Sequence, residues 1–100
     1  MFAEYQYDLY PYVLVKFNEN IKNQEDFNLF ITQWKHLYIK KKKFIFIFDT
    51  TNVSLPSIKY CYQMSKFIRE LRREPEQYLQ KSIIIVKSKN IMRLLNFIFF

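Results

Sequence analysis

The chain of 100 residues contains no glycine, a single histidine and a single cysteine. Without glycine it has neither a glycine-rich phosphate loop nor the Rossmann fingerprint, since both need glycine where the backbone approaches the ligand. One cysteine cannot form an internal disulfide, and no cysteine–histidine spacing resembles a zinc site. We therefore expect no catalytic residues, no cofactor and no metal, and a reducing, cytoplasmic location.

Long apolar runs are missing as well. No run approaches the ~20 residues that a membrane-spanning helix needs, so we expect no membrane span. The first ten residues lack the basic and apolar regions of a signal peptide. Any contact with a membrane would therefore be peripheral.

Hydrophobic residues and positive charge are abundant. Half of the residues are hydrophobic and a fifth are aromatic, which is enough for the dense core of one domain spanning residues 1–100. The net charge of +7 favours acidic partners, such as nucleic acid or anionic lipid headgroups. A disordered chain is excluded.

The chain is organised around a central apolar stretch. Four lysines, Lys40–Lys43, lead into five apolar residues, Phe44–Phe48, and then into Asp49. An apolar run without alternation is typical of a strand covered on both faces. Asp49 then falls at the carboxyl edge of the sheet, where open α/β sheets normally build their sites.

The segments before this stretch predict a hairpin and a helix. Tyr12–Phe17 is a strand, and Ala3–Tyr7 is either its antiparallel partner, across an Asp8–Pro11 turn, or a loose arm. Asn23 is a suitable N-cap in front of acidic residues, so a helix should begin there. The apolar positions of this helix form one stripe: Phe27, Phe30, Ile31, Trp34, Leu37 and Tyr38.

The segments after it predict two more helices and one more strand. Ser54 should cap the second helix, with Pro56 in its first turn, and Glu74 before Pro75 should end it. The remaining predicted elements are a short helical turn at Glu76–Gln80, a buried strand at Ser82–Lys87 and a last helix at Ile91–Phe100.

The resulting order, β-β-α-β-α-β-α, predicts an α/β fold with a mixed, mainly parallel four-stranded sheet. Right-handed crossovers between neighbouring strands would place the helices on one face. The second face would then be shielded by the final helix, by the partner in a homodimer, or by an apolar ligand. The apolar end at Phe100 indicates either a neighbour that buries it or a natural protein that continues further.

Three residues near the central strand are candidates for a switch or binding loop: Asp49, Ser54 and Ser57. Asp49 would either receive a cation or a partner's arginine, or cap N–H groups of its own loop, and capping is the favoured interpretation. Each serine would cap a helix or carry a phosphate at a helix N-terminus. His36 has no catalytic companion in the sequence, and Cys61 is expected to be a core residue.

Basic residues should gather at the amino edge of the parallel strands, because one helix-to-strand loop and the end of the second helix both return there. They would form a positive rim, which either improves solubility or binds phosphates of lipid or nucleic acid. The rim residues are Lys40, Lys41, Lys42, Lys43, Arg69, Arg72, Arg73 and Lys81.

Five segments, taken in order, carry a resemblance to known domains: a YPYVLVKF strand, a QEDFNLFITQW helix, an FIFIFDTTNVS strand and turn, a basic helix, and SIIIVKSKNIMRLLNFIF. This order resembles the STAS domain and is similar to the related CRAL-TRIO domains. The resemblance implies a compact regulatory domain with a mixed sheet and no enzymatic activity. In many STAS domains a serine after the aspartate-ended strand is phosphorylated. Ser57 is the nearest match, although the chain reads L-P-S-I there instead of the family's D-S-S-G.

The favoured functional interpretation is a non-catalytic STAS-like module that binds another protein or itself, with a homodimer as one form. The alternative is a peripheral lipid or phosphoinositide binder of CRAL-TRIO character, with the basic rim on headgroups and an apolar cleft near Ile91–Phe100 for the lipid chains. Non-specific nucleic-acid binding rests on charge alone and is the least favoured, because most phenylalanines are expected in the core.

Overall fold

The computed structural model describes residues 2–53 and 57–86 of the chain. Within them the order is β-β-α-β-α-β, which confirms the predicted α/β class. The predicted final helix, Ile91–Phe100, lies outside the described residues. The elements are β1 (Ala3–Leu9), β2 (Tyr12–Phe17), α1 (Gln24–Ile39), β3 (Phe44–Asp49), α2 (Ile58–Arg72) and β4 (Leu79–Ile85).

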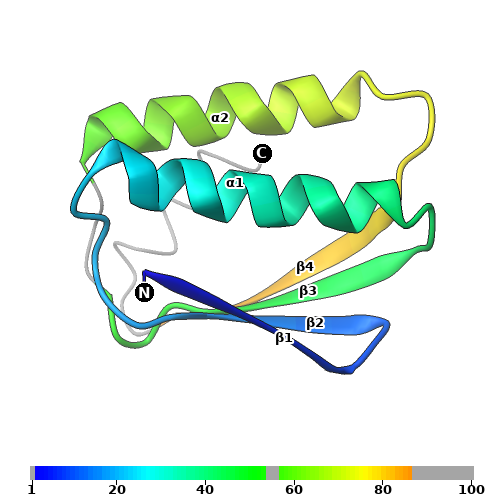
Figure 1. The fold of residues 1–100 in the computed structure, drawn as a ribbon, viewed down its shortest axis with the longest axis horizontal. Helices are drawn as coiled ribbons and strands as arrows, with labels where there is room; N and C mark the ends of the chain where they lie inside the picture. Colours follow the sequence, from blue (N-terminus) through cyan, green and yellow to red (C-terminus); the bar gives the residue numbers. More distant parts are fainter. Residues whose placement is uncertain (1, 54–56, 87–100) are drawn as a thin grey trace.

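The four strands form one mixed sheet in the order β1-β2-β3-β4. The β1–β2 pair is antiparallel, whereas β2–β3 and β3–β4 are parallel, as predicted. Both helices lie on the same face of this sheet (Figure 1). This is the arrangement expected when each right-handed crossover adds the next strand on the same side.

Helix α1 begins where the sequence predicts. The side chain of Asn23 accepts a hydrogen bond of 2.9 Å from the backbone N–H of Asp26. Glu25 and Asp26 place negative charge in the first turn, where it is favourable for the free N–H groups. The buried stripe of α1 then faces the sheet and consists of Phe27, Phe30, Trp34 and Leu37.

The core between helices and sheet is largely aromatic and centres on Trp34, which is fully buried. Its ring centroid lies 4.7 Å from that of Phe46 on β3 and 5.2 Å from that of Phe67 on α2, both in edge-to-face geometry. Such aromatic pairs add roughly 0.5–1.5 kcal/mol each beyond their buried area. Trp34 therefore connects all three packed elements.

The N-terminal hairpin is longer than predicted. Ala3 and Tyr5 are buried, so the loose-arm alternative for this segment is wrong. Leu9 pairs with Tyr12, which extends β1 to Leu9 and reduces the predicted Asp8–Pro11 turn to two residues. The hairpin therefore ends in a short, apolar tip.

Two predicted boundaries after β3 are also wrong. Helix α2 begins at Ile58 with Ser57, not Ser54, at its N-cap. The predicted helical turn at Glu76–Gln80 is absent, because the backbone N–H of Phe44 donates to the carbonyl of Tyr78 (2.9 Å) and the parallel ladder already begins at Leu79. Pairing with the amino half of β3 thus starts β4 three residues before the predicted Ser82.

Candidate interaction surfaces

The loop after β3 is held by the side chain of Asp49. One carboxylate oxygen, Oδ1, accepts hydrogen bonds from the hydroxyl of Thr51 (2.7 Å) and from its backbone N–H (3.1 Å). Both hydrogen bonds hold the pKa of Asp49 below its ordinary value, and the bond from the hydroxyl has the larger effect. The positive charge of Lys16 lowers this pKa further. Asp49 therefore has the loop-capping position that the sequence favoured.

The same loop is tied to β4 by Thr50. Its backbone N–H and its hydroxyl both donate to the carbonyl of Ile85, at 3.0 and 2.7 Å. Ser54 lies outside the described residues, so the structure does not place it relative to Asp49. Ser57 is exposed, and among the described residues its side chain makes no capping hydrogen bond. No described contact joins the three residues into one site.

The two residues with catalytic potential lie on different helices. His36 is exposed in the last turn of α1. Cys61 is buried on α2, and burial raises the pKa of its thiol, which keeps it protonated. In residues 2–53 and 57–86, no group of three His, Cys, Asp or Glu side chains is placed to hold a metal ion. Cys61 is thus a core residue, as the sequence suggested.

The lysine loop, Lys40–Lys43, packs against the tip of the β1–β2 hairpin. The ammonium of Lys40 lies 5.0 Å from the ring centroid of Tyr7 and 5.6 Å from that of Tyr10, within the range of cation–π attraction. The backbone N–H of Ile45, two residues after the loop, donates to the carbonyl of Pro11 (2.8 Å). Loop and hairpin tip therefore form a single unit.

The turn in this loop is made by Lys41, whose φ of 54° is left-handed. Its backbone N–H donates to the carbonyl of Tyr38 (3.2 Å), which closes the last turn of α1. A residue with a Cβ pays roughly 1–2 kcal/mol in this conformation, which glycine would avoid. The chain contains no glycine, so a lysine occupies this position after the end of α1 and adds a positive charge there.

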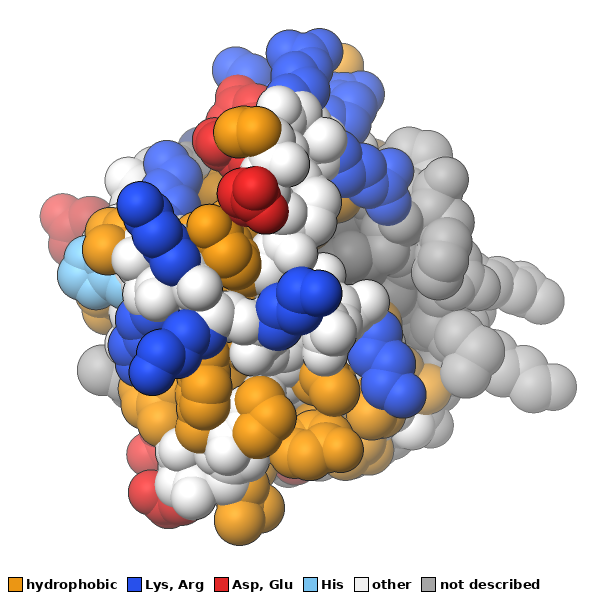
Figure 2. Space-filling model, turned by 90° about the vertical axis from the view of Figure 1, so that its right-hand side faces the viewer, with side chains coloured by type: hydrophobic (Ala, Val, Ile, Leu, Met, Phe, Trp, Pro, Cys, Tyr) orange, Lys and Arg blue, Asp and Glu red, His pale blue; other side chains and the backbone are white. Residues whose placement is uncertain are grey.

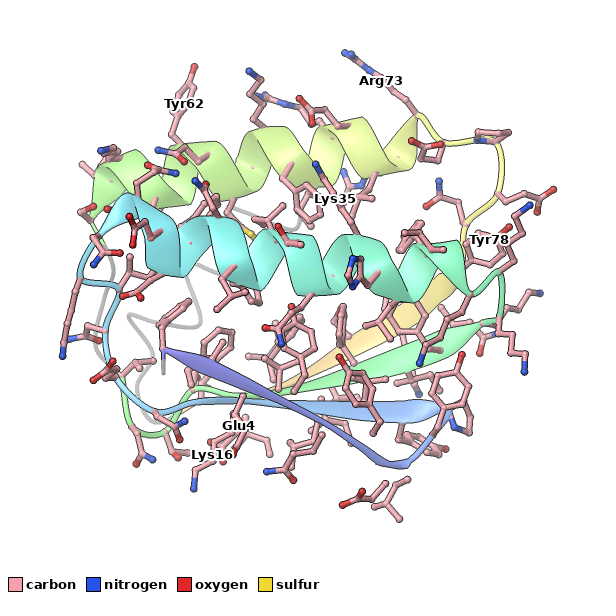
Figure 3. All side chains as sticks on the ribbon, viewed as in Figure 1. Glu4, Lys16, Lys35, Tyr62, Arg73 and Tyr78 are labelled. Atoms are coloured by element: carbon pink, nitrogen blue, oxygen red, sulfur yellow. The ribbon has the colours of Figure 1, made fainter. Side chains whose placement is uncertain are left out.

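The other basic residues of the predicted rim lie in different layers at the same end of the molecule. Figure 2 shows Lys and Arg side chains spread over this end, above a hydrophobic area. Arg69 and Arg72 belong to the last turn of α2, and Arg73 caps it and points away from the sheet (Figure 3). Lys81 is the cross-strand partner of Ile45 on the other face. The rim is thus divided into arginine and lysine parts.

The hairpin side chains beside the lysines were missed by the sequence interpretation. Leu9 is 76% exposed, Tyr12 is 46% exposed and Tyr7 is 40% exposed. The Leu-Tyr-Pro-Tyr segment at the turn of the predicted hairpin could have indicated these exposed side chains. Since β2 runs parallel to β3, its amino end had to lie beside the lysines that precede β3. The sequence interpretation considered only the phenylalanines, which were expected in the core, and so overlooked the exposed tyrosines.

A second surface is the face of the sheet opposite α1 and α2, which we call the helix-free face because neither described helix packs on it. Leu14, Ile47 and Ile83 are cross-strand partners and form one apolar row over β2, β3 and β4. Ile83 and Ile85 remain 42% and 45% exposed. Of the cover predicted on both faces of β3, the described residues supply helices on one face, and the predicted final helix lies outside them.

Charged residues border this apolar row. Lys16 pairs with Glu4 on one side and with Asp49 on the other, so acid, base and acid alternate across three strands. Figure 3 shows Glu4 and Lys16 on the side of the sheet away from the helices. Together with Lys81, they give the helix-free face charges of both signs.

A pocket of about 220 Å³ lies between β1 and α1. Its wall includes Gln33, whose Oε1 is buried without a hydrogen-bond partner among the described residues. The apolar cleft predicted near Ile91–Phe100 lies outside the described residues. The pocket is lined by Phe2, Ala3, Asp26, Leu29, Phe30 and Gln33.

Comparison of the chain with models of protein families, with curated proteins and with solved structures gives no match. Among the described residues, no helix has both the length and the apolar character that crossing a membrane requires.

Proposed function

We propose that this chain is a non-catalytic, STAS-like interaction module that associates with a second copy of itself through the helix-free face. The observation that carries this proposal is the apolar row of Leu14, Ile47 and Ile83, over which no described helix packs. The aspartate-ended β3 and the mixed sheet support the STAS-like part. The non-catalytic part rests on Asp49 as a loop cap and Cys61 as a core residue.

The physical reason for association is the parallel pairing of β2, β3 and β4. Parallel sheets occur almost always with both faces covered, whereas antiparallel sheets can leave one face in water. Here the face over which no described helix packs presents the side chains of Leu14, Ile47 and Ile83. Each isoleucine that a partner buries completely contributes about 1.5–3 kcal/mol relative to full exposure.

A second copy fits this face better than an acidic or basic partner does. A two-fold interface brings the same surface against itself, so its charges must be self-complementary. Glu4 and Asp49 supply negative charge, and Lys16 and Lys81 supply positive charge, around one apolar centre. A partner of a single charge sign would meet repulsion from half of this border.

The size of the face predicts a weak dimer. Four strands spaced about 4.8 Å apart, with six or seven residues each at about 3.3 Å per residue, give a face of roughly 20 by 20 Å. This is well below the area of about 800 Å² per partner that is typical of stable complexes. We therefore expect reversible, concentration-dependent association, which suits a regulatory module in the cytoplasm.

Light scattering across a concentration series tests the proposal with a matched pair of variants. Ile83→Glu places a charge on the helix-free face and should keep the chain monomeric at concentrations where the wild type dimerises. Ile58→Glu makes the same change at an 83%-exposed position at the start of α2 and should dimerise normally. A monomeric wild type, or dimerisation of Ile83→Glu equal to the wild type, would refute the proposal.

A further inference from the structure

We propose that the hairpin tip and the lysine loop together form a docking site for the surface of an anionic lipid bilayer. We call this site the hairpin–lysine end. It comprises Tyr7, Leu9, Tyr10, Tyr12 and Lys40–Lys43. The site meets the helix-free face at Tyr12 and its cross-strand partner Leu9, and it does not depend on self-association.

The hairpin–lysine end is pre-formed. The hydroxyl of Tyr10 faces the carbonyls of Lys42 and Lys43, at 3.4 and 3.5 Å, and its ring packs against the core. The ammonium of Lys40 is held over the rings of Tyr7 and Tyr10. Little conformational entropy would be lost when this unit meets a planar surface.

Its three kinds of side chain match the three layers of a bilayer interface. Leu9, 76% exposed at the tip, is the aliphatic group that would enter the acyl boundary. Tyr7 and Tyr12 carry amphipathic rings of the kind enriched at headgroup level. The lysines supply the attraction to anionic lipid, at about fivefold in affinity per lysine near the surface.

Charge complementarity favours an anionic surface as the occupant. None of Lys40, Lys41, Lys42 and Lys43 forms an ion pair with a described residue. A single acidic residue, Asp8, is part of the exposed tip, so positive charge dominates there. One exposed leucine would be unremarkable by itself; beside four cations and exposed tyrosines it indicates a membrane interface.

A nucleic-acid strand fits the same atoms less well. Stacking platforms for bases need aromatic rings with open faces. Lys40 already lies over the rings of Tyr7 and Tyr10, and Leu9 offers nothing on which a base could stack. An aliphatic tip gains free energy in a lipid interface and none against a phosphate backbone.

Co-sedimentation of the full chain with vesicles tests the proposal. We expect binding to vesicles of phosphatidylcholine mixed with phosphatidylserine, and much weaker binding to vesicles of phosphatidylcholine alone. Lys42→Gln with Lys43→Gln should weaken binding roughly 25-fold, at about fivefold per lysine. The control, Lys22→Gln with Lys59→Gln, removes the same charge away from the hairpin–lysine end and should bind close to the wild type.

Two further variants separate the apolar contribution from the charge. Leu9→Ser should weaken binding about tenfold, since most of a leucine's transfer free energy is lost, whereas Ile58→Ser at a comparably exposed position should have no effect. Asp8→Asn should strengthen binding, because it removes the negative charge at the tip. All these positions are exposed, so the variants should fold, and circular dichroism checks that they do.

The proposal fails if the wild type does not bind the phosphatidylserine vesicles. It also fails if the two lysine pairs weaken binding equally, or if Leu9→Ser binds like the wild type. A fluorescent oligothymidine is the comparison ligand. Binding of this strand that depends on Lys42 and Lys43, without vesicle binding, would assign the site to nucleic acid. Ile83→Glu should leave vesicle binding by the monomer intact, so this proposal and the proposed self-association fail separately.

Discussion

The two faces of β3 differ sharply although they belong to the same six residues. Toward the helices, Phe44 and Phe46 are fully buried and Phe48 is 4% exposed. Toward the other side, Ile45 and Ile47 are half-buried. One strand thus presents only aromatic rings to the core, and two isoleucines followed by Asp49 to the helix-free face.

The neighbouring strand shows the same division less strictly. Val13 and Val15 of β2 are fully buried under the helices, whereas Leu14 and Lys16 are half-buried on the other face. The comparison shows that an unbroken apolar run does not by itself tell how a strand is covered. Residue type tells more about which face is covered, because all three phenylalanines of β3 lie on the face that the helices cover. The stability of the fold should therefore depend mainly on one face of the sheet, and association on the other.

The largest expected effect comes from truncating neighbouring residues of β3. Phe46→Ala removes a ring that contacts Trp34 and should lower the free energy of unfolding by about 3–5 kcal/mol. Ile47→Ala removes a half-buried side chain and should cost about 1 kcal/mol. Urea unfolding of the monomer at low concentration measures both. Equal losses would mean that the helix-free face is covered within the monomer itself.

A smaller effect is expected at Tyr5 of β1, on the helix-covered face. Its buried hydroxyl donates to the carbonyl of Phe30 (2.8 Å), and Tyr5→Phe should cost about 1 kcal/mol at neutral pH. Tyr12→Phe is the control on the other face, where the ring is 46% exposed, and should change stability by less than about 0.5 kcal/mol.

The pH dependence of the same variant sharpens this test. Burial, with a contribution from Tyr7, raises the pKa of Tyr5 well above its ordinary value of 10.0. A raised folded-state pKa gives stability below pH 10 that is lost as the pH rises further. The wild type should therefore lose its advantage over Tyr5→Phe in alkaline solution. A difference between the two that stays constant above pH 10 would contradict the buried hydroxyl.

Local pattern was sufficient for most of the fold. Asn23 before two acids, and apolar residues at helical spacing up to Leu37, fixed α1, because capping and amphipathicity act within one segment. The boundaries of β4 were beyond this kind of inference. Leu79 joins the sheet through pairing with Phe44, and sequence-distant ladder bonds leave no local trace.

The candidate surfaces were predictable to different degrees. The lysine loop was expected at the amino edge, since any helix that returns to a parallel strand ends there. Its contact with Tyr7 and Tyr10 was missed, because it requires knowing that the hairpin tip lies beside the loop. The capping role of Asp49 was anticipated, because an aspartate reaches the N–H groups of the next residues in almost any strand-end turn.

Asp49 provides the smallest expected effect, at the border of the helix-free face. Its pKa is lowered first by the hydroxyl of Thr51, then by the backbone N–H of the same residue. A lowered folded-state pKa gives stability that is present above the ordinary value of 3.8 and is lost as the pH falls through the folded-state value. Asp49→Asn should thus cost about 0.5–1 kcal/mol at neutral pH and progressively less in acid.

Thr51→Val is the partner variant for this measurement, because it removes the first of the two donors and keeps the shape of the side chain. In a double-mutant cycle at neutral pH, the two substitutions together should cost less than the sum of their separate costs, since both break the same hydrogen bond. Additive losses, or an acid limb of the stability curve that Asp49→Asn leaves unchanged, would show that Asp49 does not hold this loop. The carboxylate would then act only in the charged border of the helix-free face, and Asp49→Asn should weaken self-association without changing the stability of the monomer.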